Sequence, residues 1–260
     1  MGRPLQLGPY CGISADGLCV GTSRFLAGPQ DGSTAEVRRG HVWLDPLASW
    51  RSQSLVLDIS FSDARADLRP NARGQWWVLG TLPPGGPPPR LDLRFRLLQP
   101  AAVRIWGLGR GERPIELAVA GQVGLRPHQR QLDGRARLSV PGLAGAAQLL
   151  GTGQWQKRSW RLQITPLQLP IATLGRFVPL QGQLGGHADG QFSLTLEQGV
   201  AGCQGQITLS DLHWQQTAPL QRLTAERLPL RCTRQRLTMA PSRWQFGTWS
   251  GQASGHIDTD

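Results

Sequence analysis

The histidines of this sequence are the side chains best suited to acid–base chemistry or metal binding near neutral pH. The five histidines are His41, His128, His187, His213 and His256. No two have the H-x-x-x-H or H-E-x-x-H spacing that brings two imidazoles to one metal ion. In the segment GGHADG, His187 and Asp189 lie close enough in sequence to form an acid–base pair. The flanking glycines favour a turn at this place over a catalytic pair.

A glycine-rich segment, WGLGRGERP, superficially resembles a phosphate-binding loop through Gly107, Gly109 and Gly111. A phosphate-binding loop needs the spacing G-x-x-x-x-G-K-[ST] and a helix that follows it. The segment has neither, so a turn or an irregular loop is favoured. The G-x-S-x-G pattern of a nucleophile elbow does not occur either. We therefore predict a protein that is not an enzyme and has no catalytic residue, cofactor or metal.

The four cysteines, Cys11, Cys19, Cys203 and Cys232, include no C-x-x-C pair. This spacing argues against a zinc site. An even number of cysteines permits disulfides, and Cys11 and Cys19 are the closest pair in sequence. Buried free thiols are nevertheless the favoured interpretation, and the redox compartment stays open.

The chain is strongly basic, with 28 Lys and Arg against 17 Asp and Glu, for a net charge of +11. Such a balance is typical of proteins that bind nucleic acid. Here the charges are nearly all arginines spread along the chain, without a run of five like charges. Scattered surface charge is favoured over a patch for an anionic polymer, a nucleic acid or lipid headgroups. The ten tryptophans favour hairpin packing over base stacking, so nucleic acid is not expected as a partner.

The dominant signal along the chain is the alternation of apolar and polar residues that is typical of half-buried strands. The segment LVLDISF, for example, places Leu55, Leu57, Ile59 and Phe61 on one face. The same alternation predicts that a second group of residues lines an apolar face, namely Leu91, Leu93, Phe95, Leu117, Val119, Trp155, Trp160, Leu162, Ile164, Phe192, Leu194, Leu196, Ile207 and Leu209.

Three hairpins are predicted from the turns between such strands. In GQWQKRSWRL, we expect Trp155 opposite Trp160 across a four-residue loop. The dipeptide Gln198-Gly199 is expected to turn the chain between two long strands, because glycine supplies the positive φ of such turns. The segment RWQFGTWSG is expected to turn at Gly247-Thr248.

Helices are predicted to be few and short. The candidates are residues 45–53, 170–178 and 219–230, the last from the spacing of Leu220, Leu223 and Leu228. Residues 81–90 form a Pro/Gly linker, which divides the chain into residues 1–80 and a repetitive strand segment, 91–260. The sequence holds no apolar run of 18 residues and no signal-peptide core. Both ends resemble interrupted strands, so we expect a segment of a longer protein.

One-sided alternation over many strands, with few helices, requires a sheet that curls over its own apolar face. A sandwich, a closed sheet and an elongated taco-like sheet all meet this requirement. The last is favoured, because the inward rows contain many Gly and Leu residues and few polar groups. The predicted fold is therefore all-β: an elongated, curled antiparallel sheet with a few short helices and an apolar interior groove.

Two passages of the sequence carry the motifs of one known family. The first passage contains Arg3-Pro4-Leu5, Leu7-Gly8, Gly17-Leu18, Gly21 and Ser23. The second contains Pro46-Leu47 and residues 71–76. In these motifs the chain resembles the N-terminal periplasmic part of TamB-like proteins, of the AsmA/TamB superfamily, in their cyanobacterial and plastid branch. Later Gly-rich strands, such as LGTGQW and LQGQLGG, continue the likeness more loosely over nearly the whole chain.

The resemblance implies a non-enzymatic, elongated β-taco in the periplasm. Members are tethered to the inner membrane and reach an outer-membrane assembly partner through a C-terminal domain. We expect residues 1–260 to correspond to the part of such a protein between the anchor and that domain. The implied functions are the assembly of outer-membrane proteins, phospholipid transfer between the membranes, or both; plastid relatives serve protein import. The implied partners are phospholipid acyl chains or unfolded outer-membrane protein strands. A basic module for an anionic polymer and a purely structural spacer remain the alternatives.

Overall fold

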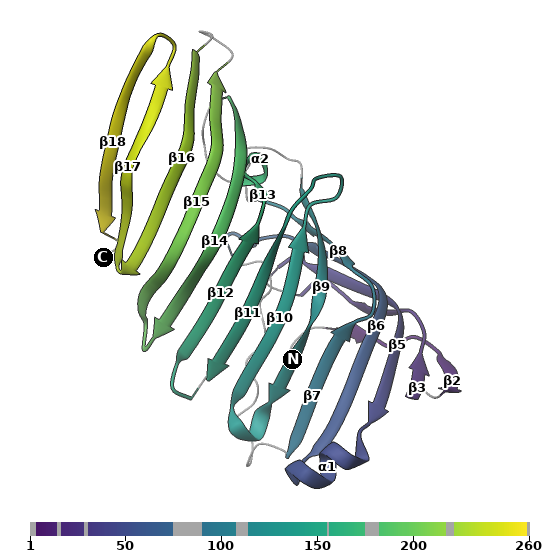
Figure 1. Ribbon diagram of the computed structural model, residues 1–260. Helices are drawn as coiled ribbons and strands as arrows, with labels where there is room; N and C mark the ends of the chain where they lie inside the picture. The colour runs from purple at the N-terminus through teal and green to yellow at the C-terminus, as the bar shows by residue number, and fades with distance from the viewer. Residues whose placement is uncertain are drawn as a thin grey trace. The chain divides into compact units, whose positions relative to one another are not determined.

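The computed structural model describes residues 4–14, 17–28, 31–74, 90–107, 114–154, 156–174, 182–216 and 221–258 (Figure 1). The chain forms two compact units, Met1–Ala136 and Arg137–Asp260. Both are built almost entirely of strands, which confirms the predicted all-β class. The predicted linker, 81–90, lies outside the described residues except for Arg90. Residues on both sides of that linker belong to the first unit.

The first unit contains a mixed sheet. Its elements in chain order are β1 (Leu5–Gln6), β2 (Tyr10–Ser14), β3 (Gly17–Val20), β4 (Ser23–Phe25), β5 (Thr34–Leu44), α1 (Pro46–Ser52), β6 (Leu55–Leu68), β7 (Leu91–Leu97), β8 (Ala101–Ile105), β9 (Ile115–Arg126), the 3-10 turn η1 (Pro127–Gln129) and most of β10 (Gln131–Ser139). β5 pairs with β6, and on its other side with β3 and β4. β7 and β8 both lie between β6 and β9.

The prediction that the sheet is antiparallel is wrong at β6, because β7 and β8 both run parallel to it. Parallel neighbours need a long crossover connection. Residues 69–90 carry the chain from the end of β6 back to the start of β7. Strand alternation alone does not reveal which way such a long connection leads.

The second unit is an antiparallel meander. Its elements are β11 (Ala146–Gln154), β12 (Ser159–Leu167), β13 (Leu169–Pro170), α2 (Ile171–Leu174), β14 (Gln183–Glu197), β15 (Val200–Gln216), β16 (Gln221–Arg234), β17 (Arg236–Phe246) and β18 (Trp249–Asp258). β11 pairs with β12, and β12 and β13 both pair with β14. From β14 to β18 each strand pairs with the next one.

Two of the three predicted hairpins are confirmed in register. β14 and β15 turn at Gln198-Gly199, and β17 and β18 turn at Gly247-Thr248. The register predicted for the first hairpin is wrong by two residues, since Gly153 pairs with Trp160, and Trp155 lies outside the described residues. A Cβ at residue 153 would overlap the Trp160 ring, so a glycine is what lets the indole lie across β11 at this place.

The helix predictions fare unequally. α1 confirms the first, because the Asp45 carboxylate accepts a hydrogen bond from the Ala48 amide at 2.8 Å and caps the helix. α2 forms only the beginning of the second, and residues 175–181 lie outside the described residues. The third prediction is wrong. Most of residues 219–230 lie in β16, where Leu223 pairs with Trp214 and Leu228 with Leu209.

A β-bulge explains the misleading leucine spacing in β16. Asp211 in β15 has a φ of 53°, and the β14–β15 register shifts between Gly185 and His187. One extra residue reverses the alternation beyond the bulge, so Leu209 and Leu212 point to the same face. β16 changes its alternation opposite this point, and β17 has its own register shift against β18. Bulges thus keep one face apolar along the whole length of these strands.

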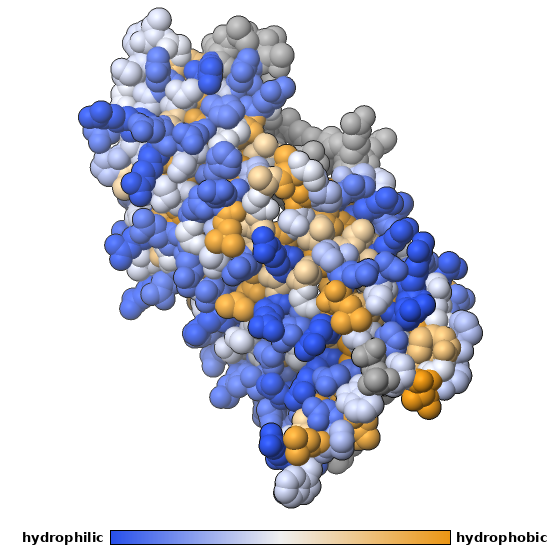
Figure 2. Space-filling view, turned by 45° about the vertical axis from the view of Figure 1, so that its right-hand side comes forward, coloured by the Kyte–Doolittle hydropathy of each residue, from blue (hydrophilic) through white to orange (hydrophobic). Residues whose placement is uncertain are grey.

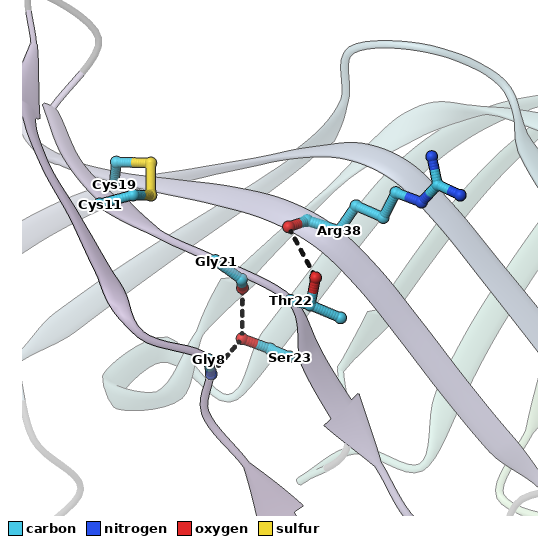
Figure 3. The surroundings of a disulfide bond; sticks show 7 residues. All are labelled: Gly8, Cys11, Cys19, Gly21, Thr22, Ser23 and Arg38. Carbon is cyan, nitrogen blue, oxygen red and sulfur yellow. Dashed lines mark hydrogen bonds between the residues drawn. A yellow bond between two sulfur atoms is a disulfide. The ribbon is translucent and has the colours of Figure 1, made fainter.

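Both cysteine pairs are disulfide-bonded, so the prediction of free thiols is wrong. Cys11–Cys19 joins β2 to β3, and its surroundings include Ser23, whose hydroxyl accepts from the Gly8 amide at 3.1 Å (Figure 3). Cys203–Cys232 joins β15 to β16 with a Cα–Cα distance of 5.7 Å. The two strands bring the second pair together from 29 residues apart in sequence. That proximity depends on strand register, which cysteine spacing does not contain.

The buried core consists mostly of small side chains. Its apolar members are Cys19, Val56, Ala101, Ile115, Ala146, Ala147, Ile171, Ala188, Ala225 and Cys232. No leucine, phenylalanine or tryptophan whose side chain is described is buried. Most of the large apolar side chains of the described residues are therefore half-buried or exposed on the sheet faces.

Candidate functional site

The second unit presents an apolar strip that crosses its sheet from strand to strand. One row of cross-strand partners consists of Ile164, Phe192, Gly205, Cys232, Leu237 and Ile257. A parallel row consists of Gly151, Leu162, Leu194 and Cys203. Direct cross-strand partners point to the same side of a sheet. The two rows therefore form one continuous face, which we call the apolar face of the second unit.

This apolar face is accessible to solvent. Trp160 and Leu194 are each 39% exposed, Leu196 is 41% exposed, and Ile257 reaches 64%. Among the described residues, the only helix in this unit is the four-residue α2, which is too short to cover a sheet of this width. Figure 2 shows apolar side chains at the surface between hydrophilic ones.

The opposite face of the same strands is polar. The row next to the apolar ones runs through Gln163, Ser193, Gln204, Thr233 and Arg236. Arg236 ends the row in an ion pair with Asp258, at 2.7 Å between Nε and Oδ1. This bond lowers the pKa of Asp258 below its ordinary value and raises that of Arg236. One face of the sheet is thus polar and the other is apolar.

The first unit has an apolar face of its own. Cross-strand partners place Leu57, Leu93 and Leu125 in one row, and Ile59 and Phe95 in the next. Phe61 stacks on Phe95 with ring centroids 6.2 Å apart. The remaining predicted residues of this unit follow the same faces, since Leu55 pairs with Leu91 across β6 and β7, while Leu117 and Val119 pair with β8.

The structure therefore brings the predicted residues together as two sets, one on the sheet of each unit. In the first unit, Leu55 is 48% exposed and none of the other predicted residues is buried. In the second, Ile207 and Leu209 extend the face along β15 through their pairs with Leu230 and Leu228. Of the predicted residues, only Trp155 lies outside the described ones.

Sequence reasoning missed a polar hollow of about 510 Å³ in the first unit. Trp43, Arg94, Arg126 and Asp133 are among its lining residues. Two of its three lining arginines are compensated: Arg126 lies 3.0 Å from Asp133, and Arg94 lies 3.4 Å from Asp45. Two aspartates also line the hollow, so its net charge is small. The signal in the sequence was Arg and Asp at alternate positions of strands β6 and β7.

Two histidines lie near a carboxylate, one in sequence and one in space. His187 lies exposed in β14, so the predicted turn is wrong, and Asp189 accepts a hydrogen bond from the Gln168 amide at 2.6 Å. His128 Nδ1 lies 3.2 Å from Asp92 Oδ1, where both side chains are mostly buried. Within the described ranges, no three His, Cys, Asp or Glu side chains are placed to hold a metal ion.

The described part of the chain contains no helix of the length and apolar character that a membrane crossing needs. Comparisons of the chain with protein-family models, curated proteins and solved structures gave no match. The assignment of function therefore depends on the two apolar faces and the chemistry around them.

Proposed function

We propose that this chain is part of a non-enzymatic scaffold of the cell envelope, which carries phospholipid acyl chains along the apolar faces of its sheets. The observation that carries the proposal is the exposure of large apolar side chains such as Trp160, Leu194 and Leu196, while the buried core is made mostly of small ones. Transfer of one methylene from water to such a face contributes about 0.8 kcal/mol. An acyl chain thus needs only an apolar wall, without catalytic groups.

In this proposal, each sheet curls over its apolar face to form an open trough. The bulges support the curvature, because a bulge bends its strand and increases the local twist. They also keep the apolar residues on one face beyond the bend, as Leu209 and Leu212 do in β15. The polar row through Gln163 and Ser193 then faces water on the outside.

The periplasm is the proposed location, with a tether to the inner membrane in the full-length protein. The two disulfides support an oxidising compartment. The resemblance of the first strands to TamB-like proteins supports a scaffold that bridges the inner and outer membranes. In that role, the client would be phospholipid on its way between the membranes.

The test is lipid extraction and native mass spectrometry on the protein purified from a bacterial host. We expect phospholipid to co-purify with the wild-type chain and to be lost in Leu162→Asp and Leu194→Asp, because these changes place a charge on the apolar face. Thr165→Asp and Gln191→Asp are the matched controls, since they place the same charge on the opposite face of the same strands. A lipid-free wild-type protein, or equal loss in both pairs of variants, would refute the proposal.

Strand capture is the second candidate function, and the edge of the second unit favours it. Among the described residues, β18 pairs with β17 alone, so its other backbone edge is available to an unfolded outer-membrane protein strand. Trp249, 75% exposed, and Ile257 would contact apolar residues of that strand. An alternating apolar peptide should then slow hydrogen exchange of β18 amides, and unchanged exchange would exclude this function.

A further inference from the structure

Three turns lie side by side at one end of the second unit's sheet. They contain Lys157-Arg158, Gln198-Gly199 and Arg234-Gln235. The Gln198 amide donates a hydrogen bond to the Arg158 carbonyl at 3.1 Å, which joins the first two turns. Arg234 pairs with Cys203, which places the third turn beside the start of β15. Residues of all three turns line an open hollow of about 1100 Å³, which we call the turn hollow.

The turn hollow is cationic. Lys157, Arg161 and Arg234 line it against a single carboxylate, Glu197. None of the ion pairs formed between described residues includes any of these three cations. The hollow in the first unit differs, because two of its three lining arginines are paired with aspartates. The positive charge of the turn hollow is therefore available to an anion.

The wall of the turn hollow is polar on one side and apolar on the other. Hydroxyl groups of Ser193, Thr195 and Thr233 line it from the polar face. Ala201 and Cys203 also line it, and they pair with Leu196 and Leu194 of the apolar face. Those two leucines lie on the other face of the same hairpin, close to its turn, and are 41% and 39% exposed. This arrangement suits an amphiphile with an anionic, hydroxyl-bearing head.

We infer that the turn hollow takes the headgroup of an anionic phospholipid of the phosphatidylglycerol class. The three cations attract its phosphate, the hydroxyl groups of the polar wall bond its oxygens, and its acyl chains lie on the apolar face from Leu196 and Leu194 onward. The inference rests on the proposed function, to which it adds a preference among lipids. A neutral zwitterionic headgroup gains less from the same site, because its own cation offsets the attraction to the phosphate.

The test compares lysophosphatidylglycerol with lysophosphatidylcholine of the same acyl length, below their micelle concentrations, by calorimetric titration of the full chain. We expect the glycerol lipid to bind about tenfold more tightly at low salt, and the preference to shrink at high salt. The triple variant Lys157→Gln, Arg161→Gln, Arg234→Gln should bind both lipids alike. Its control is Arg222→Gln, Arg227→Gln, Arg243→Gln, which removes the same charge from exposed positions outside the lining of the hollow.

The outcomes separate the two ideas. Equal binding of both lipids by the wild-type chain, or a preference that survives in the hollow variant, would overturn the inference and leave the lipid-carrying function standing. Loss of the preference in the control variant alone would place the headgroup elsewhere and also overturn it. No binding of either lipid would instead refute the proposed function on which the inference depends.

Discussion

Reduction of the Cys203–Cys232 disulfide is expected to lower the free energy of unfolding more than reduction of Cys11–Cys19. A disulfide restricts the unfolded chain, and the restriction grows with the logarithm of the loop that it closes. The sequence separations of 29 and 8 residues correspond to about 3.6 and about 2.5 kcal/mol in this chain-entropy relation. The expected difference between the two disulfides is therefore about 1 kcal/mol.

The assay is urea unfolding, followed by tryptophan fluorescence, of two variants that each keep one disulfide. Cys11→Ala with Cys19→Ala keeps the bond of the second unit, and Cys203→Ala with Cys232→Ala keeps that of the first. Each variant is measured oxidised and reduced, so that the comparison removes no atoms from the core. A loss below about 1 kcal/mol for the longer loop, or a larger loss for the shorter one, would refute the entropic reasoning.

Three further predictions concern single side chains. Val56→Ala should lower the free energy of unfolding by about 2 kcal/mol in a urea titration, because Val56 is fully buried, while Leu47→Ala at an exposed position should change it little. Asp45→Ala should cost about 1 kcal/mol through loss of the α1 cap, and Asp45→Asn should restore most of it. The pKa of Asp258 is lowered, first by the hydrogen bond from Arg236, so the contribution of this pair to stability is present at neutral pH and lost as the pH falls through the lowered pKa. Carboxyl NMR should show that Arg236→Gln returns this pKa toward its ordinary value, and no return would contradict the assignment.

Local features of the fold were predictable from the sequence because they depend on neighbouring residues. The turn at Gln198-Gly199 sets the register of β14 and β15, and Asp45 with Pro46 marks the start of α1. The predictions that were wrong concern features that depend on residues far apart in sequence. The parallel pair of β6 and β7 is decided by a long connection, and the bond between Cys203 and Cys232 is decided by strand register.

The candidate site likewise has one part that the sequence predicts and one part that it does not. Alternation identified the apolar residues of each strand, because a strand shows the period of its face directly. The turn hollow was not predictable, since its cations are far apart in sequence: Lys157 and Arg161 belong to the first hairpin, and Arg234 ends β16. In sequence these charges look scattered, which is why scattered surface charge was favoured. Only the pairing of the strands brings them to one end of the sheet.

The placement of bulges bears on whether the apolar faces serve a function or only stability. The buried core holds mostly alanine and cysteine side chains, with Val56, Ile115 and Ile171 as its larger members, while Leu194 and Leu196 stay about 40% exposed. In β15 the alternation is interrupted at Asp211, and Leu212 still points to the same face as Leu209. The bulge at Asp211 and the three-residue spacing of Leu209 and Leu212 must occur together to keep both leucines on one face. A continuous, solvent-exposed apolar surface along bent strands is what an acyl chain requires, and it adds little to the stability of the sheet alone.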